Sequence, residues 1–229
     1  MEGSLGRELE WRSARRPQRV ALPGSHVLLR PLDAEADADP LYAASHDPHG
    51  DPSIWTYLSD GPYADAGALR SALAEQQRSE DPLFFSVVPR ADGRPHGVAS
   101  YLRIAPEHGV IEIGNIWFGP GLQRSTAATE AIFLLARHAF DELGYRRLEW
   151  KCNALNAASR RAAERFGFRF EGVFESHMVV KGRNRDTAWY AITDSRWPAV
   201  RSGFGAWLGP SNFDPAGAQR RSLGDLIGS

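Results

Sequence analysis

Hydrophobic residues along the chain gather in short runs separated by turn-forming residues. Such runs, rich in Val, Ile, Phe, Tyr and Trp, are typical of β-strands. Seven segments have this character: residues 26–32, 83–88, 96–104, 111–118, 147–153, 168–181 and 186–193. Short connections join the second, third and fourth runs, so we expect these strands to pair in antiparallel fashion.

Apolar residues recur at spacings of three and four in other segments, which predicts amphipathic helices. These segments are residues 35–45, 65–79, 126–143, 156–166 and 195–208. Asp65 and Asn156 stand where a helix N-cap is expected. The order of elements predicts an α+β fold with a central mixed, mostly antiparallel sheet of about seven strands flanked by helices.

The two ends of the chain differ in composition from its middle. Residues 1–22 contain five arginines and few apolar side chains, and residues 209–229 are rich in Gly, Ser and Pro. We therefore predict an N-terminal arm (1–22), a single domain with a C-terminal helix (23–208) and a flexible tail (209–229). The apolar stripe of residues 195–208 can cover its own sheet or that of a partner, so a homodimer stays open.

The composition of the chain excludes some classes of function but does not point to one. The 229 residues are 42% hydrophobic, and 27 basic side chains nearly balance 28 acidic ones, so no global charge favours nucleic acid. A single cysteine, Cys152, forms no intramolecular disulfide and leaves too few thiols for a zinc–thiolate site. No apolar run reaches the roughly 18 residues of a membrane span and no signal-like segment is present, so we expect a cytoplasmic protein.

Residues 111–143 are the stretch around which candidate chemistry gathers. A strand-like run breaks at Gly119-Pro120-Gly121 and is followed by an alanine-rich helix for which Ser125 or Thr126 can serve as N-cap. The first N–H groups of such a helix have no intrahelical partner, and they favour phosphate oxygens together with the helix dipole. Many helix starts bind nothing, so this feature alone is weak.

A second motif makes the first more specific. Residues 156–168, NAASRRAAERFGF, predict a capped helix that ends at Gly167 before the next strand. Together with GLQRSTAATEA at residues 121–131, it resembles the GNAT superfamily of acetyl-coenzyme A dependent N-acyltransferases, and most closely its ribosomal-protein-acetyltransferase-like (RimJ/RimL-like) branch. The resemblance extends over residues 27–193.

The resemblance implies a GNAT fold, acetyl-coenzyme A as co-substrate and a set of cofactor-binding residues. In the family, a strand edge pairs with the pantetheine arm, a loop before the helix binds the pyrophosphate, and an asparagine contacts the cofactor. Thr126 stands where the family usually has glycine, although loop amides donate whatever the side chain. The corresponding residues here are Ile116, Trp117, Phe118, Gln123, Arg124, Ser125, Thr126, Ala127, Ala128, Asn156 and Ser159.

The resemblance also implies a general acid. Many members of the family place a tyrosine on the second helix, at a position that is Ala163 here. The RimJ/RimL-like branch instead has a serine three residues after the asparagine, and Ser159 matches it. A hydroxyl there can donate a proton to the departing sulfur.

Two residues are candidates for the general base. Glu112 lies on a mostly apolar strand, where alternation places it on one face with Gly114, Ile116 and Phe118 and where burial would raise its pKa. The alternative is an exposed charge or a salt bridge. His177 is a second choice, predicted to point away from Phe174 on a later strand, and its alternative is a structural role.

Residues 46–63 combine turn formers with Trp55, Tyr57 and Tyr63, which form either a wall of the acceptor cleft or staples to the core. We expect an enzyme that transfers acetyl directly to a primary amine in a ternary complex, without a metal. The acceptor is a protein N-terminus or a small molecule. A non-catalytic acyl-coenzyme A sensor and a GNAT-like fold without a coenzyme A site are the alternatives.

Overall fold

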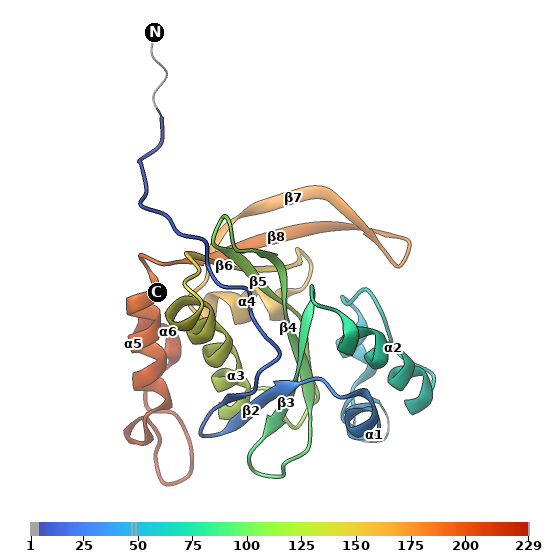
Figure 1. Ribbon diagram of the computed structural model, residues 1–229. Coiled ribbons are helices and arrows are strands. Elements are labelled where there is room, and N and C mark those ends of the chain that lie inside the picture. The colour runs from blue at the N-terminus through green and yellow to red at the C-terminus, as the bar shows by residue number, and fades with distance from the viewer. Residues whose placement is uncertain (1–4, 47, 49, 229) are drawn as a thin grey trace.

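The computed structural model describes residues 5–46, 48 and 50–228. Its centre is an eight-stranded sheet with the order β1-β2-β3-β4-β5-β6-β8-β7, in which only β5 and β6 pair in parallel (Figure 1). All seven predicted strands are present, and a two-residue strand, β1, adds the eighth. The strands are β1 (Leu22–Pro23), β2 (Val27–Pro31), β3 (Leu83–Pro89), β4 (Gly97–Ala105), β5 (Val110–Phe118), β6 (Arg147–Asn153), β7 (Arg169–Val180) and β8 (Arg183–Thr193).

Helices cover both faces of the sheet (Figure 1). The larger layer contains α3 (Thr126–Arg137), α4 (Ala157–Arg165), α5 (Trp197–Leu208) and α6 (Leu223–Ile227), and α3 continues into a π-helical turn (His138–Glu142). The smaller layer contains α1 (Ala34–Ser45) and α2 (Ala66–Arg78), and the short 3-10 helix η1 (Pro52–Trp55) lies between them in the sequence. The five predicted helices are confirmed. None of the described helices is long and apolar enough to cross a membrane.

The sheet is buried on both faces because each layer has its own apolar cluster. On β3, Phe85 and Val87 pack into the larger cluster with α3, whereas Phe84 packs into the smaller cluster with α1 and α2. Strands that are buried on both faces lose the simple alternation of apolar and polar residues. The run LFFSVV at residues 83–88 is an example.

The parallel pairing of β5 with β6 is short, and this shortness shapes the functional region. It comprises the three residue pairs from Val110 opposite Arg147 to Glu112 opposite Glu149. Beyond Glu112, β5 stays with β4, whereas β6 stays with β8 as far as Asn153. The two strands therefore separate in the middle of the sheet.

Both ends of the chain contact the domain. In the segment predicted to be an arm, the amide of Ala14 donates to Pro106 and the indole of Trp11 donates to the carbonyl of Glu107. In the segment predicted to be a flexible tail, α6 buries Leu223 and Ile227 in the larger cluster. Local composition predicts neither contact, because each depends on surfaces far away in the sequence.

A buried carboxylate joins α3 to the edge of the sheet. Glu130 accepts hydrogen bonds from the backbone N–H groups of Ser25 (2.9 Å), His26 (2.6 Å) and Val27 (2.9 Å). Gly24 allows this approach, because a Cβ at that position would lie 2.5 Å from the Glu130 carboxylate. The carboxylate therefore fixes the position of α3, and with it the loop before α3, relative to β2.

We expect Glu130→Ala to lower the free energy of unfolding by about 3 kcal/mol, because three backbone donors lose a charged acceptor in a buried place. Urea denaturation measures the change. Glu75→Ala, at an exposed position of α2, is the control and should have little effect. Equal midpoints for the two variants would contradict the role given to Glu130.

Candidate functional site

A cleft of about 320 Å³ lies where β5 and β6 separate. Its walls come from five parts of the chain: β4, β5, β6 with the first turn of α4, the β7–β8 hairpin, and the loop after η1. Among the predicted site residues, the cleft is lined by Tyr57, Glu112, Ile116, Asn156, Ser159 and His177. The structure thus brings all three predicted catalytic candidates, Ser159, Glu112 and His177, and part of the predicted cofactor set to one place.

The loop before α3 has the form expected of an anion site. Ser125 is the N-cap, and its hydroxyl accepts the N–H of Ala128 at 3.0 Å. Thr126 and Ala127 occupy the first two helical positions, whose N–H groups have no intrahelical partner. Arg124 has a left-handed backbone (φ 59°), and Gln123 donates to the carbonyl of Phe118 at 2.8 Å, which ties the loop to the end of β5.

Arg165 adds positive charge beside this loop, and the sequence analysis missed it. Its guanidinium donates to the Thr129 hydroxyl in the first turn of α3 at 3.2 Å, and it lies over the rings of Phe166 and Trp207. Burial lowers its pKa. In the sequence, Arg165 could have been noticed only as a basic residue in the last turn of the second motif. It reaches the loop only because α4 packs beside α3.

Ser159 is held as a hydrogen-bond donor by its neighbours. Its oxygen accepts the indole N–H of Trp150 at 3.0 Å, so its own proton stays available. Its backbone N–H is capped by the side-chain oxygen of Asn156 at 3.0 Å. Asn156 is therefore the helix cap, and its amide NH₂ can still donate to a ligand.

Glu112 is buried, with 5% of its surface exposed, and it forms a salt bridge. Lys151 Nζ lies 3.0 Å and Arg103 Nε 3.7 Å from the same carboxylate oxygen. Burial raises the pKa of Glu112, and the charge of Lys151 opposes the rise. The salt bridge considered as the alternative is present, and the carboxylate still lines the cleft.

Lys151 connects two buried carboxylates and was not singled out from the sequence. Its Nζ lies 2.6 Å from Glu149 and 3.8 Å from the centre of the Trp189 ring. Glu149 is held by Arg147 at 2.7 Å, and the two positive neighbours outweigh burial and lower its pKa. The sequence does contain a pattern that predicts this cluster: charged residues alternate at positions 147, 149 and 151, which places all three side chains on one face of β6.

Two of the predicted faces are wrong. Glu112 was expected to share a face with Ile116 and Phe118, but those two side chains pack against the larger cluster, while Glu112 points away from it. The cause is a bulge: Asn115 has φ 49°, and the register with β4 shifts there. Strict alternation fails at such a residue.

The same reason applies to β7. Phe174 was expected to point away from His177, but their rings meet edge to face with centres 5.5 Å apart. Ser176 between them has φ 48°, and the register with β8 shifts. His177 Nδ1 lies 2.9 Å from the Thr187 hydroxyl, so this histidine lines the cleft as part of a local hydrogen bond.

The aromatic residues of the loop divide between two places. Tyr57 lines the cleft and donates to the carbonyl of Leu155 at 3.3 Å. Trp55 and Tyr63 line a neighbouring cavity of about 180 Å³, and Trp55 packs on Trp117 with ring centres 5.1 Å apart. Trp55 is 2% exposed and packs in the smaller cluster, so it makes the contacts of a staple to the core while it lines this cavity.

Comparison with known proteins agrees with this geometry. A family model described as an acetyltransferase (GNAT) domain matches residues 26–169. A GCN5-related N-acetyltransferase from Brucella melitensis is 47% identical, with 96% of this chain and 99% of that chain covered and a TM-score of 0.93. The chain belongs to the GNAT acetyltransferase family.

Other solved structures extend the comparison. A protein assigned to the GNAT family from Chromobacterium violaceum ATCC 12472 is 40% identical, with 86% and 98% of the two chains covered and a TM-score of 0.78. The microcin C7 self-immunity acetyltransferase MccE, solved with acetyl-CoA and AMP, shares the fold at 20% identity, 74% and 93% coverage and a TM-score of 0.61. No curated protein sequence matches the chain.

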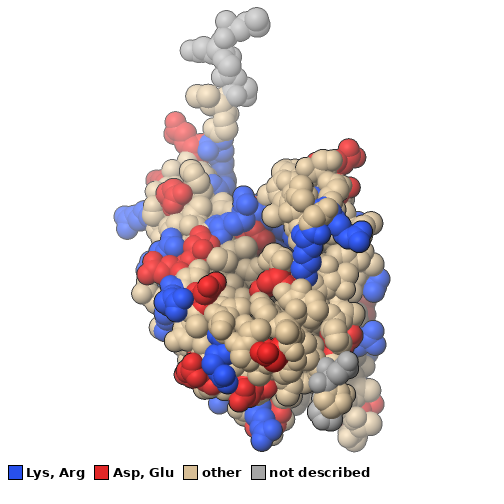
Figure 2. Space-filling model, turned by 90° about the vertical axis from the view of Figure 1, so that its right-hand side faces the viewer, with Lys and Arg blue, Asp and Glu red and all other residues tan. Residues whose placement is uncertain are grey.

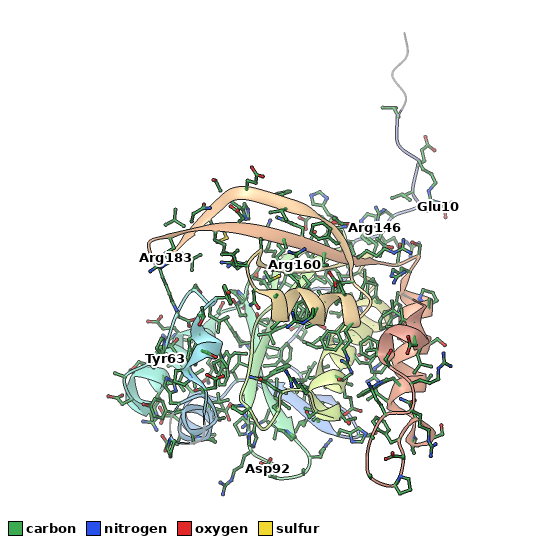
Figure 3. All side chains as sticks on the ribbon, turned by 180° about the vertical axis from the view of Figure 1, so that it is seen from behind. Glu10, Tyr63, Asp92, Arg146, Arg160 and Arg183 are labelled. Atoms are coloured by element: carbon green, nitrogen blue, oxygen red, sulfur yellow. The ribbon has the colours of Figure 1, made fainter. Side chains whose placement is uncertain are left out.

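This GNAT enzyme also has a bridge across its cleft. At the tip of the β7–β8 hairpin, Lys181 Nζ donates to the carbonyls of Trp55 (2.9 Å), Asp60 (2.9 Å) and Gly61 (2.7 Å). Figure 3 shows the hairpin passing above α4, marked by Arg160, and ending at Arg183 over the side of the molecule that carries Tyr63. The hairpin thus closes one end of the site against the loop.

We expect Lys181→Met to release the loop without unfolding the domain, because three charged hydrogen bonds to its backbone are lost. Hydrogen exchange of a peptide that contains residues 55–61 should become about threefold to thirtyfold faster. Arg183→Met, at an exposed position of the same hairpin, is the control. Unchanged exchange in the Lys181 variant would show that the loop is held by packing alone.

Proposed function

We propose that the protein transfers the acetyl group of acetyl-coenzyme A directly to a primary amine that is bound, together with the cofactor, in the cleft between β5 and β6. The observation that carries this proposal is that Ser159 and Glu112 line one cleft, which opens where the two strands separate, while the loop before α3 is tied to the end of β5. The acceptor is a small-molecule amine or a protein N-terminus.

The residues on both sides of the opening fit coenzyme A. The first N–H groups of α3, with Arg124 and Arg165 nearby, suit the phosphates. Thr126 in place of glycine keeps its N–H and adds a hydroxyl. Beyond Glu112, the β5 edge that faces β6 has no strand partner in the described part of the chain, so its peptide groups are available to the amides of a pantetheine arm.

When bound, acetyl-coenzyme A supplies an activated acetyl group, and the net reaction releases the free thiol and one proton. Glu112 is placed to take that proton from the acceptor ammonium, since its pKa is raised and it lines the cleft. Ser159 is placed to give its hydroxyl proton to the departing sulfur, because Trp150 occupies its oxygen as a donor. The second proton that the amine nitrogen loses as the amide forms restores the Ser159 hydroxyl. Both groups act from rigid elements, β5 and α4.

A thiol-release assay over a panel of amines tests the proposal. Acetyl-coenzyme A should raise the melting temperature, and at least one amine should release free thiol with formation of the amide. A stabilised protein that releases no thiol with any amine would mean binding without transfer. An unshifted melting temperature would remove the cofactor site from the proposal.

We expect Ser159→Ala to lower kcat about tenfold to a thousandfold, with little change in affinity for acetyl-coenzyme A. Its backbone N–H is still capped by Asn156, so α4 keeps its start. Steady-state kinetics and calorimetric titration separate the two effects. Ser71→Ala, on the surface of α2, is the control. A rate near that of the unchanged enzyme would assign proton donation to another group.

We expect Glu112→Gln to lower kcat and to remove an ionisation from the pH profile. The active form is the carboxylate, so the rate of the unchanged enzyme falls as pH drops through the raised pKa of Glu112. Lys151→Met should move this limb to higher pH, because the cation that opposes the rise is lost. Rates are measured with one amine, so that its own ionisation is constant.

Glu107→Gln, in the exposed turn between β4 and β5, is the control for the carboxylate, and melting temperatures check that each variant is folded. An identical limb in the enzyme and in Glu112→Gln would exclude Glu112 as the base.

A further inference from the structure

One face of β8 points donor groups along the wall of the cleft. Arg185, Thr187 and Trp189 alternate with residues of the opposite face, and the first two line the cleft. The buried Nε of Arg185 and the indole nitrogen of Trp189 have no hydrogen-bond partner among the described residues. Buried donors of this kind are costly unless a ligand or water accepts from them.

The charges that line the cleft do not balance. Glu112 is its one carboxylate among the described lining residues, against the cations of Arg103, Lys151 and Arg185. Lys151 is compensated by Glu112 and by Glu149, and Arg103 faces Glu112. Arg185 forms no ion pair within the part of the chain that the structure describes. Arg185 is therefore the cation of the lining whose charge is free to pair with an anionic ligand.

Arg185 lies close to the place where transfer is proposed. Cys152, which lines the same wall, has a pKa that burial raises, and the neighbouring Ser159 and the charge of Arg185 act on it in the opposite direction. Arg185 is four residues from Trp189, on whose ring the Glu112 partner Lys151 lies. Four residues of strand span about 13 Å, so Arg185 stands about that far along β8 from the strand position that pairs with Lys151.

We propose that Arg185 binds an anionic group of the acceptor, a carboxylate or a phosphate, while the amine of the same molecule lies at Glu112 in the same cleft. This inference rests on the proposed function and names the class of its substrate. The cofactor phosphates have their own place at α3 and Arg165, and the pantetheine arm is neutral, so neither supplies the anion at this wall. A guanidinium suits both groups because its parallel N–H donors match two oxygens.

Matched pairs of acceptors, which differ only in the anionic group, test the proposal. The carboxylate arm compares ω-amino acids of increasing length with their amides, and the phosphate arm compares aminoalkyl phosphates with the parent amino alcohols. A peptide arm compares Ala-Asp-amide with Ala-Asn-amide and represents a protein N-terminus. We expect kcat/KM for the anionic member of at least one arm to be about tenfold to a hundredfold higher.

The variant Arg185→Met should abolish this preference, while kcat/KM for the neutral member stays within about threefold. Arg185→Lys should keep part of it, since the charge remains and the paired donors do not. Arg183→Met, two residues away on the same strand and exposed, should keep all of it. Affinity for acetyl-coenzyme A should be unchanged in all three variants.

A binding measurement separates failure of this inference from failure of the proposed function, because it needs no turnover. The enzyme saturated with coenzyme A is titrated with N-acetyl-Ala-Asp-amide, N-acetyl-β-alanine and N-acetylaminoethyl phosphate, each beside its neutral counterpart. Tighter binding of at least one anionic member, lost in Arg185→Met, supports the inference even if no amine is acetylated. Equal binding within every pair, or a loss of acetyl-coenzyme A affinity in Arg185→Met, overturns it.

Discussion

The separation of β5 from β6 is the constraint on which the functional region depends. Continued parallel pairing would close the sheet, but a bulge ends it after Glu112. Asn115 takes a left-handed backbone there, and its side chain donates to Ser100 at 3.1 Å, while Ser100 donates to the carbonyl of Gly114 at 3.0 Å. Side-chain hydrogen bonds thus maintain a backbone shape that sheet pairing alone would not favour, and the opening they leave is the cleft.

The electrostatics of the cleft follow from this opening. Glu112 is the last residue of β5 that pairs with β6, so its carboxylate is buried by the sheet yet reaches the cleft. Burial alone would favour the neutral acid, and Lys151 limits that shift by standing between Glu112 and Glu149. Lys151 and Arg103 both contact this carboxylate, so two cations hold it in position at the wall of the cleft. On the face of the molecule that Figure 2 shows, acidic and basic side chains are interspersed, with no surface of a single charge.

Periodicity and capping signals were sufficient for strands β2 to β8 and helices α1 to α5, since each of these carries its pattern locally, whereas β1 and α6 were not predicted. The loop before α3 could also be predicted, because a strand, a turn and a capped helix are contiguous in sequence. What the sequence could not supply were contacts made across the sheet. The positive φ values at Asn115 and Ser176 reversed the expected faces of the strands. Neither asparagine nor serine requires a positive φ, so the sequence did not predict these bulges. Lys151 and Arg185 could be assigned to the wall of the cleft only once the pairing of β6 with β8 was known.

The position of Ser159 illustrates how packing distinguishes two residues of one helix. Ala163 is fully buried in the larger cluster and does not line the cleft, so a side chain at that position would have to extend out of the core to reach the cleft. Ser159, one turn earlier, faces the cleft beside Trp150. Trp150 is itself fixed by the rings of Phe166 and Phe168, at 6.0 and 5.6 Å. The aromatic core thus orients an indole, and the indole occupies the serine oxygen as a donor, so the hydroxyl keeps its own proton for an acceptor in the cleft.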